Sequence, residues 1–211
     1  MVNAMSHRGD EPTVVDSRTF SYTLDAHDRI VAVNAEWEAF ARENGAPTLP
    51  ERVIGTTLWQ YLADVDTRYH YAQLFWHARA YGETIRLPYR CDAPGLVREM
   101  EMEIIPYADG RLELRTSMRR QRARAPAPLL DADVLRSEEL IIMCGWCKRV
   151  ELGGAWYDID ELRAQDPRFE TELLPSVSHG MCDDCQAMTL VKLSQLTTGA
   201  PGRAGGREAT A

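Results

Sequence analysis

The stretch ETIRLPYRCDAPGLVREMEMEIIPYADGRLELRTSM, residues 83–118, decides the fold of the first half of the chain. Within it, Met100, Met102 and Ile104 alternate with glutamates, and this period of two is typical of a strand with one buried face. The pair Asp109–Gly110 predicts a tight turn into RLELRTSM, which repeats the alternation. We therefore expect three consecutive antiparallel strands in this stretch.

The residues that precede this stretch show both the strand period and the helical period. FSYTLD and RIVAVN are short strand-like runs that predict an opening hairpin. Residues 35–45 and 66–81 instead place apolar side chains at helical spacing. The order of two strands, several helices and three strands predicts an α+β fold, in which helices cover one face of a five-stranded antiparallel sheet.

Four of the five cysteines form two CxxC pairs, in MCGWCKRV at residues 143–150 and SHGMCDDCQ at residues 178–186. A zinc ion is satisfied by four thiolates in a tetrahedron, and each CxxC turn directs two sulfurs towards one point. The predicted zinc ligands are therefore Cys144, Cys147, Cys182 and Cys185. Because four thiolates leave no coordination position for a substrate, this ligand set favours a structural or sensory ion over a catalytic one.

The pattern divides the chain into five segments. Residues 1–17 and 197–211 lack periodicity and are predicted to be disordered. The five-stranded domain is assigned to residues 18–120, and a small zinc-binding unit, here called the cysteine module, to residues 139–196. Residues 121–138 are predicted to be a linker, because prolines interrupt every regular pattern there.

The composition predicts a cytoplasmic protein. The N-terminal residues contain no apolar core of a signal peptide, and no stretch approaches the ~18 apolar residues that a membrane helix needs. In a reducing compartment, paired cysteines are more often metal ligands or redox switches than disulfides. The net charge of -8 argues against direct nucleic-acid binding. The arginines between residues 119 and 124 form a solvated end of the linker or contact an acidic partner.

The first half of the chain resembles a PAS domain. The resemblance rests on the hairpin ending in Asn34, on VIGTTLWQYL with Gly55 and Trp59, on the long helix ending YGE and on the three closing strands. The block PYRCDAPGLVREMEMEI also resembles a bacterial PAS subgroup. These features cover about half of the chain.

The second half resembles a short cysteine-rich module that follows PAS or receiver domains in bacterial signalling proteins. The matching features are MCGWCKRV, then Gly154 and Trp156, then LPSVSHGMCDDC. Together the two resemblances imply a sensor or regulator that is not an enzyme and acts through a protein partner or a homodimer. A PAS domain would bind a small ligand between sheet and helices, and Trp59, Tyr71 and Phe75 are the predicted lining residues.

Three residues close to the cysteines have predicted supporting roles. His179 lies three residues before Cys182, so it either replaces one thiolate as a ligand or makes a hydrogen bond to a ligand sulfur. Lys148 and Arg149 follow the first pair and are placed to offset the charge of about -2 on a four-thiolate zinc ion. The alternative is that both are ordinary surface cations.

Some PAS domains hold haem through a histidine in the region of the long helix. His70 and His77 project to the side of the core face of that helix, which predicts a rim or surface location and disfavours haem. Tyr69 and Trp76 lie on the opposite face, which we expect to be buried against the cysteine module or a second subunit; partial exposure is the alternative. The unpaired Cys91 is predicted to be a buried apolar residue, with a reactive thiol as the alternative.

The sequence therefore predicts a PAS-like sensor joined to a zinc site, with no enzymatic activity. The first rival is a thiol redox switch, in which the same cysteines form disulfides and release zinc on oxidation. The second rival is a CxxC oxidoreductase. It is disfavoured because neither pair is expected at a strand-to-helix turn of a βαβ unit.

Overall fold

The computed structural model describes residues 17–171 and 173–199. Its first unit is a five-stranded antiparallel sheet with the strand order β2-β1-β5-β4-β3. The strands are β1 (Thr19–Leu24), β2 (Ile30–Val33), β3 (Ile85–Arg90), β4 (Leu96–Pro106) and β5 (Leu112–Ala123). The helices between β2 and β3 are α1 (Ala35–Glu43), α2 (Leu49–Val53), the 3-10 helix η1 (Leu58–Tyr61) and α3 (Val65–Tyr81). The predicted α+β fold is confirmed.

The alternation of residues along β4 explains why the helices cover a single face of this sheet. Met100, Met102 and Ile104 are buried, while Glu99 is exposed on the opposite face. Met102 and Ile104 belong to the same core cluster as residues of α3, and Met100 packs with residues of α1. Both helices therefore bury the apolar face that the sequence pattern predicts.

The long helix α3 has clear signals at both ends. At its start, the Asp64 carboxylate accepts a hydrogen bond from the Thr67 backbone N–H at 2.6 Å. At its end, Gly82 adopts a left-handed conformation with φ of 69°, which glycine reaches without a steric penalty. The helix consequently begins and ends close to the boundaries that the sequence predicts.

The second unit is a four-stranded sheet with the strand order β8-β7-β6-β9. The strands are β6 (Leu135–Cys144), β7 (Val150–Leu152), β8 (Ala155–Tyr157) and β9 (Leu173–Gly180). The helices are η2 (Pro128–Leu130), α4 (Ile159–Gln165), η3 (Pro167–Glu170) and α5 (Asp183–Gly199). β5 and β6 thus extend into the range assigned to the linker, and α5 extends past residue 196. Residues 1–16 and 200–211 of the predicted disordered ends lie outside the described residues.

The second unit has a core of its own beneath its sheet. Its buried residues are Ala127, Leu129, Ile141, Met143, Val150, Ile159, Leu162 and Phe169. Strands β6 and β9 pair in parallel, and α4 lies between them in the sequence, so the unit contains a β-α-β connection. The carboxyl ends of the two strands consequently meet at one edge of the sheet.

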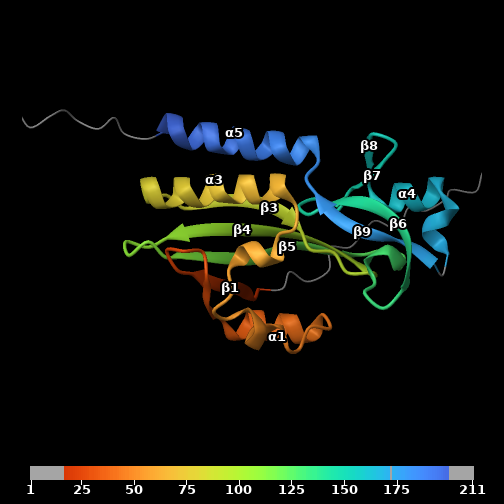
Figure 1. Cartoon of the computed structure of the whole chain (residues 1–211), viewed down its shortest axis with the longest axis horizontal. Helices are drawn as coiled ribbons and strands as arrows, with labels where there is room; N and C mark the ends of the chain where they lie inside the picture. Colours follow the sequence, from red (N-terminus) through yellow and green to blue (C-terminus); the bar gives the residue numbers. More distant parts are fainter. Residues whose placement is uncertain (1–16, 172, 200–211) are drawn as a thin grey trace, which may run out of the picture.

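The two units pack closely against each other. The second sheet lies at one end of the first, and α5 runs back alongside α3, on the side of α3 that faces away from the sheet (Figure 1). Residues of both units share one core cluster, which contains Leu74 and Phe75 of α3 together with Trp146, Met181 and Cys185. The cysteine module is therefore part of the PAS-like core and not a separate appendage.

The packing of α5 on α3 corrects the predicted location of two histidines. The side chains of His70 and His77 are only 5% and 2% exposed, so a rim or surface location is wrong. A surface location follows from the helical period only if α3 packs on the sheet alone, and α5 supplies a second surface against which α3 packs. Because both histidines are buried, a surface location no longer disfavours haem. The His77 imidazole packs against the Tyr81 ring, with ring centroids 4.4 Å apart.

No helix within the described residues combines the length and the apolar character needed to cross a membrane.

Candidate metal centre

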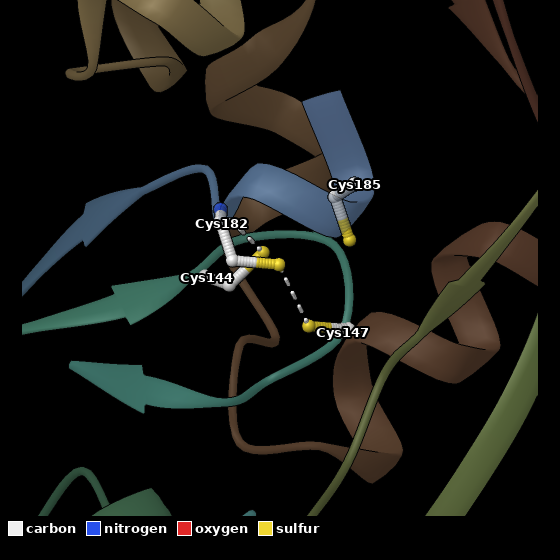
Figure 2. Close-up of side chains that lie close together, drawn as sticks. All are labelled: Cys144, Cys147, Cys182 and Cys185. Carbon is white, nitrogen blue, oxygen red and sulfur yellow. Dashed lines mark hydrogen bonds between the residues drawn. The ribbon is translucent and has the colours of Figure 1, made fainter. Parts of the chain in front are cut away.

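The four predicted ligands come from the ends of β6 and β9 and from the start of α5 (Figure 2). Cys144 is the last residue of β6, and Cys147 lies in the loop that follows. Cys182 lies between β9 and α5, and Cys185 is in the first turn of α5. Because Cys144 pairs with Gly180 in the parallel register, the two CxxC segments start side by side.

The four sulfur atoms converge on one point. Their Sγ atoms all lie within 4.8 Å of one another, and those of Cys147 and Cys182 are 3.6 Å apart. A tetrahedral ion with metal–sulfur bonds of about 2.3 Å places its sulfurs about 3.8 Å apart. The four thiols thus fit a tetrahedral metal ion that prefers soft sulfur ligands.

The backbone holds the two CxxC segments together. The Gly145 N–H donates to the Gly180 carbonyl at 2.9 Å, and the Cys182 N–H donates to the Cys144 sulfur at 3.5 Å. A Cβ at Gly180 would lie 2.8 Å from Cγ2 of Ile142 on the paired strand, so a larger residue cannot fit without movement. Gly180 is therefore required by the close approach of β6 and β9, rather than by a turn.

Arg149 contacts two sulfurs of the cluster. Its guanidinium donates to the Cys147 sulfur at 3.4 Å and to the Cys182 sulfur at 3.5 Å, and it also pairs with Asp184 at 2.6 Å. It is placed to offset thiolate charge, as the sequence predicts. The ammonium of Lys148 instead donates to the Gly145 carbonyl at 3.0 Å.

The pKa values of the four-cysteine cluster are shifted in different directions. Hydrogen bonds from Cys144 and Cys185, reinforced by Arg149, lower the pKa of the Cys147 thiol. Burial raises the pKa of Cys182 to about 11, and hydrogen bonding with Cys144 and Cys147 raises the pKa of Cys185. Because a metal ion binds thiolates, it must displace these protons. The affinity of the cluster for metal should therefore fall as the pH falls.

His179 lies outside the cluster of four sulfurs. Its side chain is exposed on one side and lines a cavity of about 220 Å³ between α3 and the first CxxC loop. Burial, with a smaller contribution from Lys148, lowers the pKa of its imidazole. Lys148 lines the same cavity, so Lys148 and His179 both face the space between the two units.

Trp146, between the first two cysteines, connects the candidate metal centre to the PAS-like domain, and its sequence position alone does not predict this contact. Its side chain is only 3% exposed and packs on the Tyr71 ring of α3 at a centroid distance of 5.6 Å. Its carbonyl accepts a hydrogen bond from the Arg90 N–H of β3 at 2.6 Å. The only signal available in the sequence was an aromatic residue placed inside a metal-binding turn.

The three residues predicted to line a PAS ligand pocket are brought together. Phe75 lies 5.7 Å from the ring of Trp59 and 5.6 Å from that of Tyr71. Phe75 is only 1% exposed, and Trp146 packs against the same group. Of the three, Tyr71 also lines the cavity beside His179.

Tyr69 and Trp76 remain uncovered by the cysteine module. Their side chains are 58% and 59% exposed, because α5 packs on a different side of α3. A contact of this face with the cysteine module is therefore wrong, and a contact with a second subunit stays a prediction. Cys91 is partly buried against the cluster of Phe20, Met100 and Met118, and burial raises the pKa of its thiol.

The second CxxC pair lies at a strand-to-helix turn, contrary to the expectation from the sequence. Cys182 follows β9, which pairs in parallel with β6, and α5 begins at Asp183. The sequence LLPSVSHG of β9 contains a proline and does not alternate in polarity, which is why the strand was not predicted. The stated argument against an oxidoreductase is therefore wrong. The convergence of all four sulfurs replaces it as the feature that defines the site.

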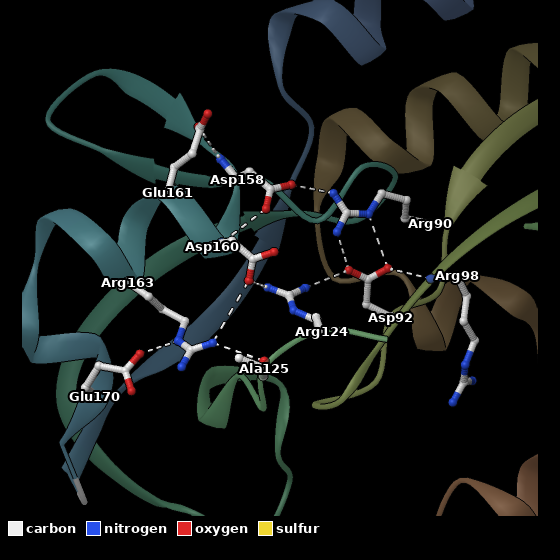
Figure 3. A network of polar contacts seen from close by, with 10 residues as sticks. All are labelled: Arg90, Asp92, Arg98, Arg124, Ala125, Asp158, Asp160, Glu161, Arg163 and Glu170. Atoms are coloured by element: carbon white, nitrogen blue, oxygen red, sulfur yellow. Dashed lines mark hydrogen bonds and ion pairs between the residues drawn. The ribbon is translucent and has the colours of Figure 1, made fainter. Parts of the chain in front are cut away.

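An ion-pair network fixes the cysteine module to the PAS-like sheet (Figure 3). Asp92, whose side chain is 0% exposed, pairs with both Arg90 and Arg124. Each arginine also reaches a carboxylate near the start of α4: Arg90 contacts Asp158 at 2.6 Å, and Arg124 contacts Asp160 at 2.7 Å. Asp158 also caps α4, so the network sets the position of that helix relative to β3.

Comparison with solved structures finds PAS domains and sensor proteins. A domain of an HTR-like protein from Haloarcula marismortui is 19% identical, with a TM-score of 0.34, over 48% of this chain and 97% of that one. A sensory box sensor histidine kinase from Vibrio cholerae is 14% identical, with a TM-score of 0.34, over 48% and 81% of the two chains. The PAS domain of nitrogen regulation protein NR(II) from Vibrio parahaemolyticus is 20% identical, with a TM-score of 0.28, over 48% and 88%. No family model matches the sequence, and no curated protein matches it significantly.

Replacing Asp92 with Ala should lower the free energy of unfolding by about 3 kcal/mol, because it leaves Arg124 buried without one of its two counter-charges. The matched control is Glu139→Ala, which breaks an exposed ion pair with Arg168 and should change stability by less than about 0.5 kcal/mol. Urea unfolding measures both. Equal losses in the two variants would show that the network does not hold the units together.

Replacing Cys182 with Ser should abolish stoichiometric metal binding, because three thiolates and a hydroxyl form a much weaker site for a soft-ligand ion. Cys91→Ser is the control, since Cys91 lies outside the cluster and should leave the metal content unchanged. Elemental analysis and the thermal midpoint of both proteins test this. Full metal content in the Cys182 variant would contradict the assigned ligand set.

Proposed function

We propose that this chain is a non-enzymatic cytoplasmic signalling protein, in which a PAS-like sensor domain is coupled to a structural or sensory zinc ion. The observation that carries the proposal is the position of Trp146. The loop that supplies two of the four sulfurs also places this indole on Tyr71 inside the PAS-like core. A change in the cysteine loop would therefore alter the packing of the PAS-like core, and a change in that core would alter the loop.

Zinc is the metal that the donor set favours. Four thiolates complete its tetrahedral shell, and the ion would supply a fixed geometry for the loops rather than an open coordination position for chemistry. Arg149 would compensate part of the thiolate charge. With no coordination position left for a substrate, the role we assign to the ion is to hold Cys144–Cys147 and the start of α5 in place.

The signal would leave the protein by contact with another protein. The face of α3 that carries Tyr69 and Trp76 is exposed, and Val65 on the same helix is 73% exposed. Apolar residues grouped on one surface favour an interaction site. We assign this face to a protein partner or to a second copy of the chain.

Protein purified under reducing conditions is expected to contain one zinc ion per chain by elemental analysis, with no absorption in the visible region. Chelation should lower the unfolding midpoint, because the metal binds the folded state far more tightly than the unfolded chain. A metal-free protein with an unchanged midpoint would contradict a zinc-dependent fold. Stoichiometric iron with a visible spectrum would replace zinc with a different cofactor.

A redox switch is the second candidate, favoured by one contact. The sulfurs of Cys147 and Cys182 lie 3.6 Å apart and come from different CxxC pairs. Hydrogen peroxide would oxidise these two thiols to a disulfide, and its two oxygens would leave as two water molecules. Loss of the two thiolates would release the ion.

Mild peroxide should release zinc from the reduced protein, and a thiol reductant should restore binding, if the switch operates. The disulfide is expected to join Cys147 to Cys182, and peptide mapping of the oxidised protein would identify it. The comparison is a peptide or domain with a generic structural four-cysteine zinc site. Release no faster than from that site would leave only the structural role.

A further inference from the structure

A cavity between the two units is lined by none of the four cysteines and shares Tyr71 with the predicted PAS pocket. It measures about 220 Å³. Residues from η1 to the middle of α3 form one wall, and residues of the first CxxC loop together with His179 form the other. An apolar cavity of about 150 Å³ is known to take up a benzene molecule, so this volume accommodates a single aromatic ring with a small substituent.

One wall of the cavity suits an aromatic ring. Tyr71 and Trp146 both line it, and their rings lie 5.6 Å apart. Leu62 and Ala63 add apolar surface. A planar ring can stack against such side chains at a gain of about 0.5–1.5 kcal/mol beyond the burial of its area.

The polar groups that line the cavity suit a carboxylate. Thr67 lines the cavity, and its hydroxyl has no hydrogen-bond partner and is closed to solvent, so a rotation about the Cα–Cβ bond is needed to turn it towards a ligand acceptor. An unpaired buried hydroxyl costs free energy, which a ligand acceptor would recover. Lys148 adds an ammonium that donates one of its three protons to Gly145, and His179 adds a second donor.

Among the described residues, Asp64 is the one carboxylate in the cavity wall, and its charge is already engaged. It accepts the Thr67 N–H at 2.6 Å and caps the N-terminus of the long helix α3. Negative charge at a helix N-terminus is compensated by the helix dipole. The uncompensated charge that faces the cavity is therefore the positive one of Lys148.

We propose that this cavity binds a small aromatic carboxylate, with its ring against the Tyr71 and Trp146 side chains and its carboxylate on Lys148 and the Thr67 hydroxyl. The inference deepens the proposed signalling function and rests on it for its biological meaning. The ligand would touch α3 and, through Trp146 and Lys148, the loop that carries Cys144 and Cys147. It would thus connect the PAS-like domain to the metal site.

The test uses benzoate as the probe and benzyl alcohol as its neutral counterpart, titrated calorimetrically into the full-length, metal-loaded protein. Benzoate should bind saturably, and benzyl alcohol at least tenfold more weakly. Lys148→Asn should weaken benzoate at least tenfold, since asparagine tolerates the left-handed backbone at this position, where φ is 63°, but removes the charge.

Thr67→Val separates a binding role from a structural one. Valine keeps the shape and removes a hydroxyl that has no partner, so the unfolding midpoint should stay the same or rise. Benzoate affinity should nevertheless fall about fivefold, the scale of one lost hydrogen bond. Thr23→Val on β1, away from the cavity lining, is the matched control and should leave benzoate affinity unchanged.

Three results would overturn the proposal: no saturable binding of benzoate, equal binding of benzyl alcohol, or unchanged affinity in both the Lys148 and Thr67 variants. Metal content measured on the same samples separates this failure from failure of the proposed function. A chain with one zinc ion that ignores benzoate would overturn only the ligand site. A chain without zinc would overturn the proposed function.

Discussion

The contact between Trp146 and Tyr71 is the interaction on which the rest of the structure depends. Trp146 lies between two cysteines of the four-sulfur cluster, yet its ring is buried on a helix of the PAS-like domain. Burying a side chain of this size contributes on the order of 3–5 kcal/mol, which is a large fraction of the stability of a small domain. A metal ion held by the cysteines would fix the shape of this loop, and the metal site and the PAS-like core would then stabilise each other.

This arrangement explains the polar contacts around the interface. Two carboxylates near the start of α4 pair with arginines that Asp92 holds in place, so the orientation of the module does not depend on apolar packing alone. Buried ion pairs are costly to form and costly to break on one side only. They therefore favour one relative orientation of the two units, in which Trp146 can enter the PAS-like core.

The first sheet and the four ligands could be predicted from the sequence, because each has a strong local signal. The period of two around Met102 identifies β4, and the CxxC spacing identifies the sulfurs. The parallel pairing of β6 with β9 could not be predicted, because LRSEELIIMC and LLPSVSHG have no clean alternation. The burial of His70 and His77 depends on a helix more than 100 residues later, and no local pattern encodes that contact. The burial of Trp146 likewise depends on a distant contact, with Tyr71 of α3, so no local pattern predicts it.

The central claim is that the metal and the PAS-like core form one cooperative unit. Hydrogen exchange measured by mass spectrometry on the reduced protein, with and without its metal, tests this most directly. The account predicts that metal removal speeds exchange in α3 (Val65–Tyr81) and β3 (Ile85–Arg90) as well as in the loops that carry the cysteines. Faster exchange confined to residues 139–196, with α3 and β3 unchanged, would contradict it.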